Sequence, residues 1–343
     1  MGSDLELKFL INIPEGTIRG KGRVAWAFLT LSLRFRYPAG KRKIEVNVAS
    51  SEEKLFKRIK NSVGRAIADF GLIEEGDRIA VAVSGGKDSY TLLHLLETLR
   101  RRAPIRYEIL AINIDSGYPG YRADIIEKHL ERHGFAYHME KTDHFDIIKE
   151  KRRPGSSYCS ICARLKRGVL YTSAQRFNCN KLALGHHLDD FVETLLLNQF
   201  FVGSLKAMAA SMLADNGEIT VIRPLVYVEE RDIAAFARNE GYPVVCCRCP
   251  VCGGADLQRK RMKELLATLE RENPHVKRSM LKALSNVQPR HLLDRRLRLD
   301  EGRPPAEGYV TAWPLTESPS TSVTLTLTSK LTSAEHPVTE TGM

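Results

Sequence analysis

The sequence predicts an α/β protein built on a doubly wound parallel sheet with helices on both faces. Between residues 77 and 235, apolar runs of strand length alternate with longer segments of helical periodicity. The runs are apolar almost throughout, as in strands that are buried on both faces. The chain has 343 residues, of which 43% are hydrophobic, and this is enough for one large core. A small helical segment that contains cysteines is expected to follow the sheet domain.

The expected elements follow one another in a regular order. A basic amphipathic helix is predicted within residues 50–73, where Ser51 can cap the helix and acidic residues fill its first turn. Because a helix follows most strands, crossovers should connect them and pair them in parallel. The predicted strands are 78–84, 107–115, 135–142, 181–187 and 218–225. The helices that follow are predicted from about 88, from about 123, around 162–177, from near Asp189 and from near Glu229.

The chain is predicted to divide into five segments. Its first part shows no period that favours helix or strand, and its last part is rich in Ser, Thr and Pro, which is typical of disorder. The segments are a poorly ordered extension (1–50), a lead-in helix (51–76), the α/β domain (77–235), a basic C-terminal segment (236–298) and a disordered tail (299–343).

The charge of the chain favours a polyanionic partner. Lys and Arg number 52 against 41 Asp and Glu, which gives a formal net charge of +11. Basic clusters such as 149–155 and 259–263 suit RNA or DNA, although a solvated basic face would have the same composition. No run of 18 apolar residues occurs, so no transmembrane helix is expected, and we predict a cytoplasmic protein.

The loop "SGGKDS" (84–89) joins the first predicted strand to its helix. Glycines let backbone amides approach an anion, and the start of a helix adds free N–H groups and a favourable dipole. Lys87 would add a positive charge, Ser84 and Ser89 hydroxyl donors, and Asp88 a helix cap or a link to hydrated Mg²⁺. A phosphate is therefore the expected ligand. The loop matches neither the Walker A nor the G-x-G-x-x-G pattern, and an ordinary capped turn is the structural alternative.

A second segment, "LALGHHLDDFVETLLLN" (182–198), places Asp189 and Asp190 at the start of a helix that follows a strand. The helix dipole alone could account for two carboxylates there. In a doubly wound sheet, however, they would face the same crevice as the loop. If the loop binds a nucleotide triphosphate, carboxylates beside it would hold Mg²⁺. Asp115 ends another strand at that edge and is interpreted as a turn residue in preference to a nucleotide ligand.

Six of the seven cysteines lie in two groups, at 159/162 and at 246–252. Such grouping favours a metal site in a reducing compartment over a framework of disulfides. The pairs Cys159/Cys162 and Cys249/Cys252 both have C-x-x-C spacing, which fits either a zinc site or an iron–sulfur cluster. The remaining ones, Cys179, Cys246 and Cys247, are interpreted as adventitious buried thiols.

The residues "SGGKDS" resemble the pyrophosphate loop of the PP-loop ATP pyrophosphatase superfamily. Over residues 54–294 the chain is similar to the tRNA 2-thiocytidine synthetase family. Six stretches carry the resemblance: "SGGKDSYTLL", "CSICARLKRGVLY", "LALGHHLDDFVETLLLNQFF", "VIRPLVYV", "CGGADLQR" and "LSNVQPRHLLD". The resemblance implies a tRNA sulfurtransferase. With ATP it would adenylate the C2 oxygen of a cytidine (position 32) in the tRNA anticodon loop, release pyrophosphate and then replace that oxygen with sulfur.

The resemblance also implies which residues carry the reaction. The loop Ser84, Gly85, Gly86, Lys87, Asp88 and Ser89 would hold ATP, with Lys87, Asp88, Asp189 and Asp190 as catalytic residues and the last two on Mg²⁺. A [4Fe–4S] cluster would be held by Cys159, Cys162 and Cys252, which leaves one iron without a protein thiolate. Cys249 is the rival third ligand, because four cysteines crowd into 246–252 and the spacing to "LQR" is altered. The implied partners are tRNA, a cysteine desulfurase or other persulfide donor, and a second copy in a homodimer.

Two alternatives remain from the sequence. Another PP-loop ligase, forming 2-thiouridine or lysidine, would use the same ATP chemistry. The paired cysteines argue against lysidine and the ending "LSNVQPRHL" against 2-thiouridine. The second alternative is not an enzyme: a non-catalytic RNA-binding module whose cysteines bind a structural zinc ion. Its Gly-Gly loop would serve only as a turn.

Overall fold

The structure of the protein is a computed structural model that describes residues 50–151, 158–215, 217–249 and 257–294. The fold lies within residues 50–287. A second unit begins at Gln288, and its described part contains the short 3₁₀ helix η2 (Pro289–His291). The predicted extension at 1–50, apart from residue 50, and the predicted tail at 299–343 lie outside the described residues. Among the described residues, no helix is long and apolar enough to cross a membrane.

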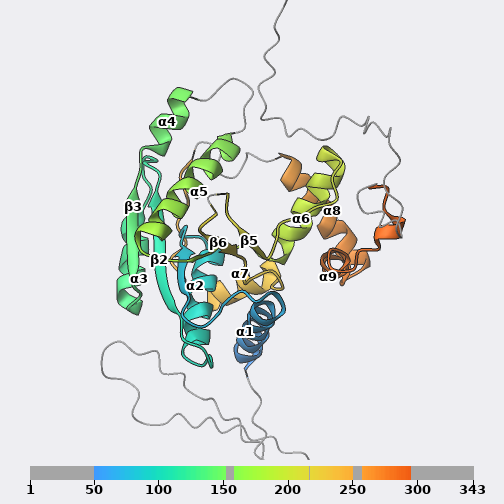
Figure 1. The fold of residues 1–343 in the computed structure, drawn as a ribbon, viewed down its shortest axis with the longest axis horizontal. Helices are drawn as coiled ribbons and strands as arrows, with labels where there is room; N and C mark the ends of the chain where they lie inside the picture. The colour runs from blue at the N-terminus through green and yellow to red at the C-terminus, as the bar shows by residue number, and fades with distance from the viewer. Residues whose placement is uncertain (1–49, 152–157, 216, 250–256, 295–343) are drawn as a thin grey trace, which may run out of the picture. The chain divides into compact units, whose positions relative to one another are not determined.

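Six strands form one sheet in the order β3-β2-β1-β4-β6-β5 (Figure 1). All neighbouring pairs are parallel except β5–β6. The order moves outward from β1 to β2 and β3 on one side and to β4 and β6 on the other, as in a doubly wound sheet. The strands are β1 (Arg78–Ala82), β2 (Glu108–Asp115), β3 (Tyr137–Lys141), β4 (Lys181–Ala183), β5 (Ser211–Leu213) and β6 (Thr220–Ile222).

The helices of the described residues lie on both faces of the sheet and beyond its β5 side (Figure 1). They are α1 (Ser51–Phe70), α2 (Lys87–Arg100), α3 (Ala123–His133), α4 (His144–Lys151), α5 (Tyr158–Arg176), α6 (Leu188–Leu197), α7 (Glu230–Asn239), α8 (Leu257–Glu272) and α9 (Val276–Ala283). A π-helical turn η1 (Asn198–Val202) continues α6.

The alternation of side chains along β1 shows why both faces are covered. Ile79 and Val81 join the large core cluster with α1, α2, α3 and α7, whereas Ala80 joins the cluster with α5 on the opposite face. Residues 79–81 are all fully buried. This confirms for β1 the prediction of an apolar strand buried on both sides, whereas β3 is only half-buried. A third cluster packs α6 against α8 through Leu188, Val192 and other apolar residues.

Three local expectations differ from the structure. Ser50, not Ser51, caps α1: its hydroxyl accepts a hydrogen bond from Glu53 N–H (3.1 Å), and the Glu53 carboxylate accepts one from Ser50 N–H (3.0 Å). Only Ser50 has an acidic residue three positions later, which completes a capping box. Helix α4 and strand β5 were not predicted, because both are short and lack a clear apolar period. Strand β5 makes the edge of the sheet antiparallel, joined to β6 by a tight connection in which Gly217 has φ +73°.

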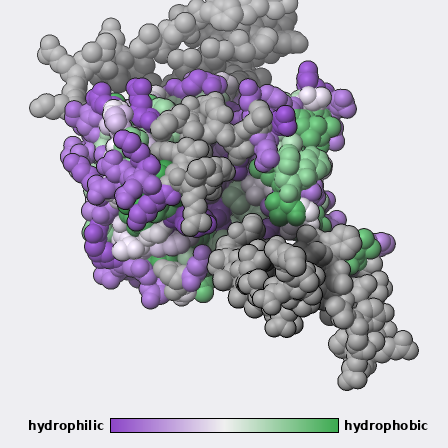
Figure 2. Space-filling view, turned by 90° about the horizontal axis from the view of Figure 1, so that it is seen from above, coloured by the Kyte–Doolittle hydropathy of each residue, from purple (hydrophilic) through white to green (hydrophobic). Residues whose placement is uncertain are grey.

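On the face shown in Figure 2, the surface of the described residues is mostly hydrophilic, with a continuous apolar area on one side and smaller apolar areas elsewhere. Several large apolar side chains are exposed around η1 and β5, including Phe200, Val202 and Leu213. The apolar residues of these two segments are therefore not part of the core, although η1 directly follows the buried helix α6.

Candidate functional site

The loop at 84–89 leaves the carboxyl end of β1 and turns directly into α2. Gly85 has φ +83°, and a Cβ atom on it would lie 2.7 Å from Ile126 Cδ1 of α3. Gly86 is the N-cap of α2 and donates its N–H to Ser84 Oγ (3.3 Å). Ser89 Oγ donates to the Gly86 carbonyl (2.9 Å). The loop is therefore a close-packed turn that presents the N-terminus of a helix, as an anion site requires.

The loop and the second predicted motif are in backbone contact. A Cβ atom on Gly185 would lie 3.2 Å from the carbonyl carbon of Asp88 and 3.3 Å from the amide nitrogen of Ser89. Two residues later, His187 Nε2 lies 3.8 Å from Asp88 Oδ1. Segments separated by about a hundred residues in the sequence thus form one site at the carboxyl edge of β1 and β4, which are neighbours in the sheet.

Both predicted aspartates of the second motif lie at the start of α6, but their partners differ. Asp189 is buried, accepts a hydrogen bond from Glu230 N–H (2.7 Å) and pairs with Lys277 Nζ (2.9 Å). Asp190 accepts a hydrogen bond from His187 N–H (3.0 Å) and so closes the first turn of α6. The two carboxylates therefore connect the start of α6 to Glu230 and Lys277 and close its first turn.

Lys87 is held by two carboxylates. Its Nζ lies 3.2 Å from Asp88 Oδ1 and 3.1 Å from Glu230 Oε1. Burial lowers the pKa of Lys87, but these two charges outweigh it and raise that pKa above its usual value. The side chain is about 30% exposed, so the ammonium group is oriented and still reachable from solvent.

Glu230 is a site residue that the sequence reasoning missed. Its other oxygen pairs with Lys263 Nζ at 2.5 Å, so the carboxylate bridges two lysines. Burial raises the pKa of Glu230, but the hydrogen bond from Lys263 and the charge of Lys87 bring it down to about 2. At the start of a helix, Glu230 looks like an ordinary dipole-stabilising acid, and nothing in the sequence pointed to its contact with the loop.

Asp88 carries the oxygen best suited to a metal ion. Its Oδ1 is buried and accepts no hydrogen bond, although the Lys87 ammonium lies 3.2 Å away. His187 Nδ1 is likewise buried without a hydrogen bond. A carboxylate oxygen is the kind of donor that Mg²⁺ prefers. A cavity of about 230 Å³ lies beside Asp189, lined by charged residues that include Glu230, Lys263 and Lys277.

The buried acid Glu193 on α6 faces the same corner. Burial, and next the charge of Asp190, raise the pKa of Glu193 to about 7. His186 is affected in the opposite sense, because burial lowers the pKa of its imidazole. Both shifts follow mainly from burial, which favours the neutral form of each group.

Two described cysteines, one from each predicted group, lie in the same apolar cluster. Cys162 on α5 and Cys249 both pack against an apolar cluster that contains Tyr118 and Ile148. Tyr118 Oη donates a hydrogen bond to Cys162 Sγ at 3.5 Å. Both side chains end in a thiol, and soft thiolates are the donors of an iron–sulfur cluster. The side chain of Cys159 and the whole of Cys252 lie outside the described residues, so the third ligand stays a prediction.

Residues 244–249 connect the loop to the cysteines. Val245 N–H donates to the Gly85 carbonyl at 2.9 Å, and exposure alternates along the segment, with Val244 and Cys246 outward and Cys247 and Cys249 turned inward. The prediction that Cys246 is buried is therefore wrong, because its side chain lies on the exposed side of this segment. Cys247 is only partly buried, while the predicted burial of Cys179 is confirmed.

Asp115 ends β2 at the same sheet edge. Its Oδ1 accepts a hydrogen bond from Gly117 N–H (2.9 Å), the pattern of an Asx turn, and Gly117 has φ +75°. This confirms its interpretation as a turn residue.

Comparison with known proteins gives consistent similarities. A family model described as a PP-loop domain matches residues 51–245. Over 251 residues, 73% of this chain and 100% of the relative, the sequence is 80% identical to the tRNA-cytidine(32) 2-sulfurtransferase of Geotalea uraniireducens. It is 64% identical to the protein of that name from Syntrophotalea carbinolica over 247 residues, 72% of this chain and 95% of the relative.

Among solved structures, the fold resembles the U34-tRNA thiolase NcsA from Methanococcus maripaludis, solved with its [4Fe–4S] cluster. The TM-score is 0.56 at 22% identity, covering 70% of this chain and 80% of that one. At this identity the likeness concerns the fold.

Proposed function

This chain belongs to the PP-loop family and, within it, to the tRNA-cytidine(32) 2-sulfurtransferases, and from that premise we propose that it is an ATP-dependent enzyme that thiolates tRNA. The observation that carries the proposal is the contact of Gly185 with the backbone of Asp88 and Ser89. This contact makes one site from the phosphate-type loop and the acidic helix start, at the sheet edge where α/β proteins bind nucleotides.

ATP would place its phosphates on the loop 84–89. The free N–H groups at the start of α2 and the Lys87 ammonium would bind the phosphates. The C2 oxygen of the cytidine attacks the α-phosphorus, and the bond between that phosphorus and the bridging oxygen breaks. Pyrophosphate leaves and the base is adenylated. A sulfur nucleophile then attacks C2, and AMP leaves with the oxygen.

Mg²⁺ would be held by carboxylates of the same edge. Each carboxylate would have to exchange a present partner: Asp88 its ion pair with Lys87, Asp189 its ion pair with Lys277, and Asp190 its hydrogen bond with His187 N–H. When bound, the ion supplies positive charge that stabilises the leaving pyrophosphate.

The sulfur would come through a [4Fe–4S] cluster held by Cys159, Cys162 and either Cys252 or Cys249. The shared packing of Cys162 and Cys249 against Tyr118 supports a thiolate site at this position. When bound, a cluster with one iron free of protein thiolates can supply a sulfur atom for transfer. A persulfide donor upstream, a homodimer and a cytoplasmic location complete the proposal.

The test removes Lys87. Lys87→Ala should abolish ATP-dependent thiolation and pyrophosphate release while iron and sulfide stay at wild-type content, because the Lys87 side chain pairs with Asp88 and Glu230 and is not a predicted cluster ligand. Lys54→Ala, an exposed lysine on α1, is the control and should keep wild-type activity. Full thiolation by Lys87→Ala would contradict the assignment of the loop.

Nucleoside analysis of tRNA from a deletion strain identifies the product. Loss of 2-thiocytidine, and its return with the wild-type chain, is expected. Unchanged 2-thiocytidine with loss of 2-thiouridine would instead assign the chain to the other PP-loop thiolases. Stoichiometric zinc without sulfide in anaerobically purified protein would favour the RNA-binding module.

A further inference from the structure

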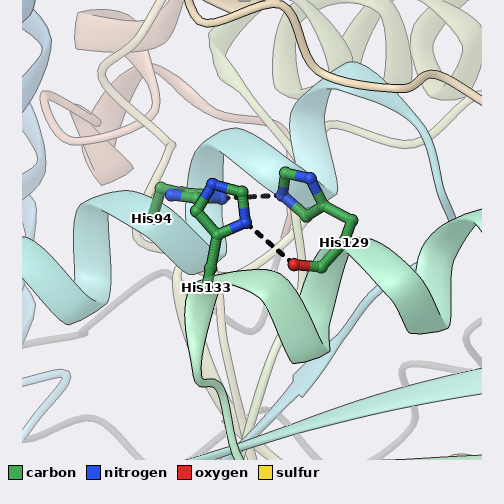
Figure 3. Close-up of side chains that lie close together, drawn as sticks. All are labelled: His94, His129 and His133. Carbon is green, nitrogen blue, oxygen red and sulfur yellow. Dashed lines mark hydrogen bonds between the residues drawn. The ribbon is translucent and has the colours of Figure 1, made fainter. Parts of the chain in front are cut away.

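Three histidines that the proposed reaction does not use meet between α2 and α3. His94 lies in the second turn of α2, and His129 and His133 lie one turn apart on α3. His94 Nε2 is 2.9 Å from His129 Nε2, and one nitrogen from each ring can be chosen so that all three lie within 4.8 Å of one another. Figure 3 shows the three rings converging.

The second nitrogen of His133 is fixed by the backbone. His133 Nδ1 lies 2.8 Å from the His129 carbonyl oxygen, so this nitrogen must carry the proton and donate it. The lone pair of His133 is then on Nε2. Metal-bound histidines commonly have this arrangement, in which a backbone carbonyl orients the ring and sets its tautomer.

We propose that His94, His129 and His133 form a three-nitrogen site for a divalent transition-metal ion of the Zn²⁺ type. Three imidazoles with a fourth position open to solvent, water or a further ligand are a known donor set for zinc. Imidazole nitrogens select Zn²⁺, Ni²⁺, Cu²⁺ or Co²⁺ and disfavour Mg²⁺ and Ca²⁺, which prefer oxygen. The site is distinct from the cysteines because it contains no sulfur.

Burial favours the metal-binding form of two of the rings. Burial, and next the neighbouring histidines, lower the pKa of His94 to about 3, and burial lowers that of His129 to about 4. The imidazoles of His94 and His129 are therefore neutral at physiological pH and need not lose a proton to bind. His129 is buried, whereas His133 is exposed, so an ion can reach the site from solvent.

Aromatic side chains surround the cluster. Tyr242 stacks on His94 with ring centroids 4.9 Å apart, Tyr90 lies edge-on to His129 at 4.7 Å, and Phe135 lies edge-on to His94 at 5.1 Å. At Zn–N distances of about 2.0–2.1 Å, tetrahedral ligand nitrogens stand about 3.3 Å apart. The 2.9 Å separation of His94 and His129 requires only a small rotation of either ring.

An ion at this position would link the two helices that flank the ATP loop. Helix α2 begins inside the loop, and α3 contributes Ile126, which packs against Gly85. Bound metal would therefore stabilise the local arrangement of α2 and α3. We expect its effect to appear first as a higher melting temperature.

The experiment measures Zn²⁺ binding to the full chain by equilibrium dialysis, for wild type, His133→Ala, His129→Gln and the control His275→Ala. His275 is exposed at the start of α9, outside the cluster. X-ray absorption separates the nitrogen shell expected here, at about 2.0–2.1 Å, from zinc on thiolates at about 2.3 Å. Far-UV circular dichroism checks the fold of each variant.

The expected result is one Zn²⁺ per wild-type chain with a nitrogen shell, together with a melting temperature that rises with Zn²⁺. His133→Ala is the decisive variant, because this ring is exposed and its removal leaves the core intact; it should weaken binding at least tenfold and abolish the rise. His275→Ala should behave as wild type. Wild-type Zn²⁺ affinity in both His133→Ala and His129→Gln, or a zinc shell of sulfur alone, would overturn the proposal and leave the cluster as aromatic packing.

Discussion

Two glycines decide how closely the parts of the nucleotide site approach one another. Gly85 makes room for Ile126, and Gly185 makes room for the peptide between Asp88 and Ser89. The neighbour of Gly185 is backbone, which cannot rotate away as a side chain can. Gly185 is therefore the position where a single methyl group should displace the two motifs relative to each other.

Gly185→Ala is expected to destabilise the protein by about 1–3 kcal/mol and to reduce pyrophosphate release more than the loss of folded protein explains. The added Cβ would lie 3.2 Å from the Asp88 carbonyl carbon. Urea unfolding and a pyrophosphate assay measure the two effects. The matched control is Gly64→Ala on α1, where a Cβ meets nothing within 4 Å; it should be neutral or stabilising. Equal behaviour of the two variants would contradict this account of the site.

Glu230 should make the free energy of unfolding depend on pH in the acidic range. Its pKa is about 2 in the folded protein and 4.5 for the free side chain, so the unfolded chain takes up the proton first as pH falls. The stabilisation by the two lysines is then fully present above about pH 4.5 and is lost as pH falls toward 2.

Glu230→Gln tests this by urea unfolding at several pH values. The variant should be less stable than wild type at pH 7, and the difference should shrink as pH falls from 4.5 to 3. A difference that stays constant with pH would assign the loss to packing and not to charge.

At the scale of elements, the segment 244–249 connects two parts of the proposed site, which its composition does not indicate. One end pairs with Gly85 of the loop, and the other carries Cys249 to the cluster that contains Cys162. The segment thus spans from the ATP loop to the thiols in five residues. The sequence groups these cysteines correctly but does not show that they follow a residue bound to the loop.

Serine variants distinguish the cysteines that bind the iron–sulfur cluster from those that do not. Cys162→Ser should lose iron and sulfide in anaerobically purified protein, because it removes one of the predicted thiolate ligands of the iron–sulfur cluster. Cys179→Ser, whose thiol is buried against the opposite part of the sheet, and Cys246→Ser, whose thiol is exposed, should keep both. Of Cys249→Ser and Cys252→Ser, the variant that loses iron identifies the third ligand. Full iron content in Cys162→Ser would refute the assignment.

At the scale of the whole molecule, the charge of +11 is the feature that concerns tRNA. Binding to the phosphate backbone releases counterions, so the affinity should fall steeply with salt. We expect at least a tenfold loss of tRNA affinity between about 50 and 200 mM salt, measured by filter binding. Lys87→Ala should leave this slope unchanged, because Lys87 is assigned to ATP. A salt-independent affinity would argue against phosphate contacts.

Features that depend on neighbouring residues could be predicted from the sequence, whereas contacts between distant residues could not. The strands at 79–81 and the starts of α2 and α6 could be predicted, because local periodicity and helix-start chemistry determine them. The pairing of Lys87 with Glu230 and the meeting of three histidines could not, because they join residues far apart in the chain. Strand β5 was not predicted because its three residues are too few to show the alternation of apolar and polar side chains that indicates a strand.

The sequence by itself determined the parallel order of the fold, the phosphate-type loop, the two cysteine groups and the resemblance to a tRNA-thiolating family. These are properties of short segments, where residue type and spacing set the local backbone and its chemistry. Only the tertiary structure decided that Gly185 rests on Asp88, that Asp189 is held by Lys277, that Cys246 points outward and that His94 joins His129 and His133. The reason is physical: packing across the sheet brings distant segments into contact, and burial then sets the protonation of the groups that meet.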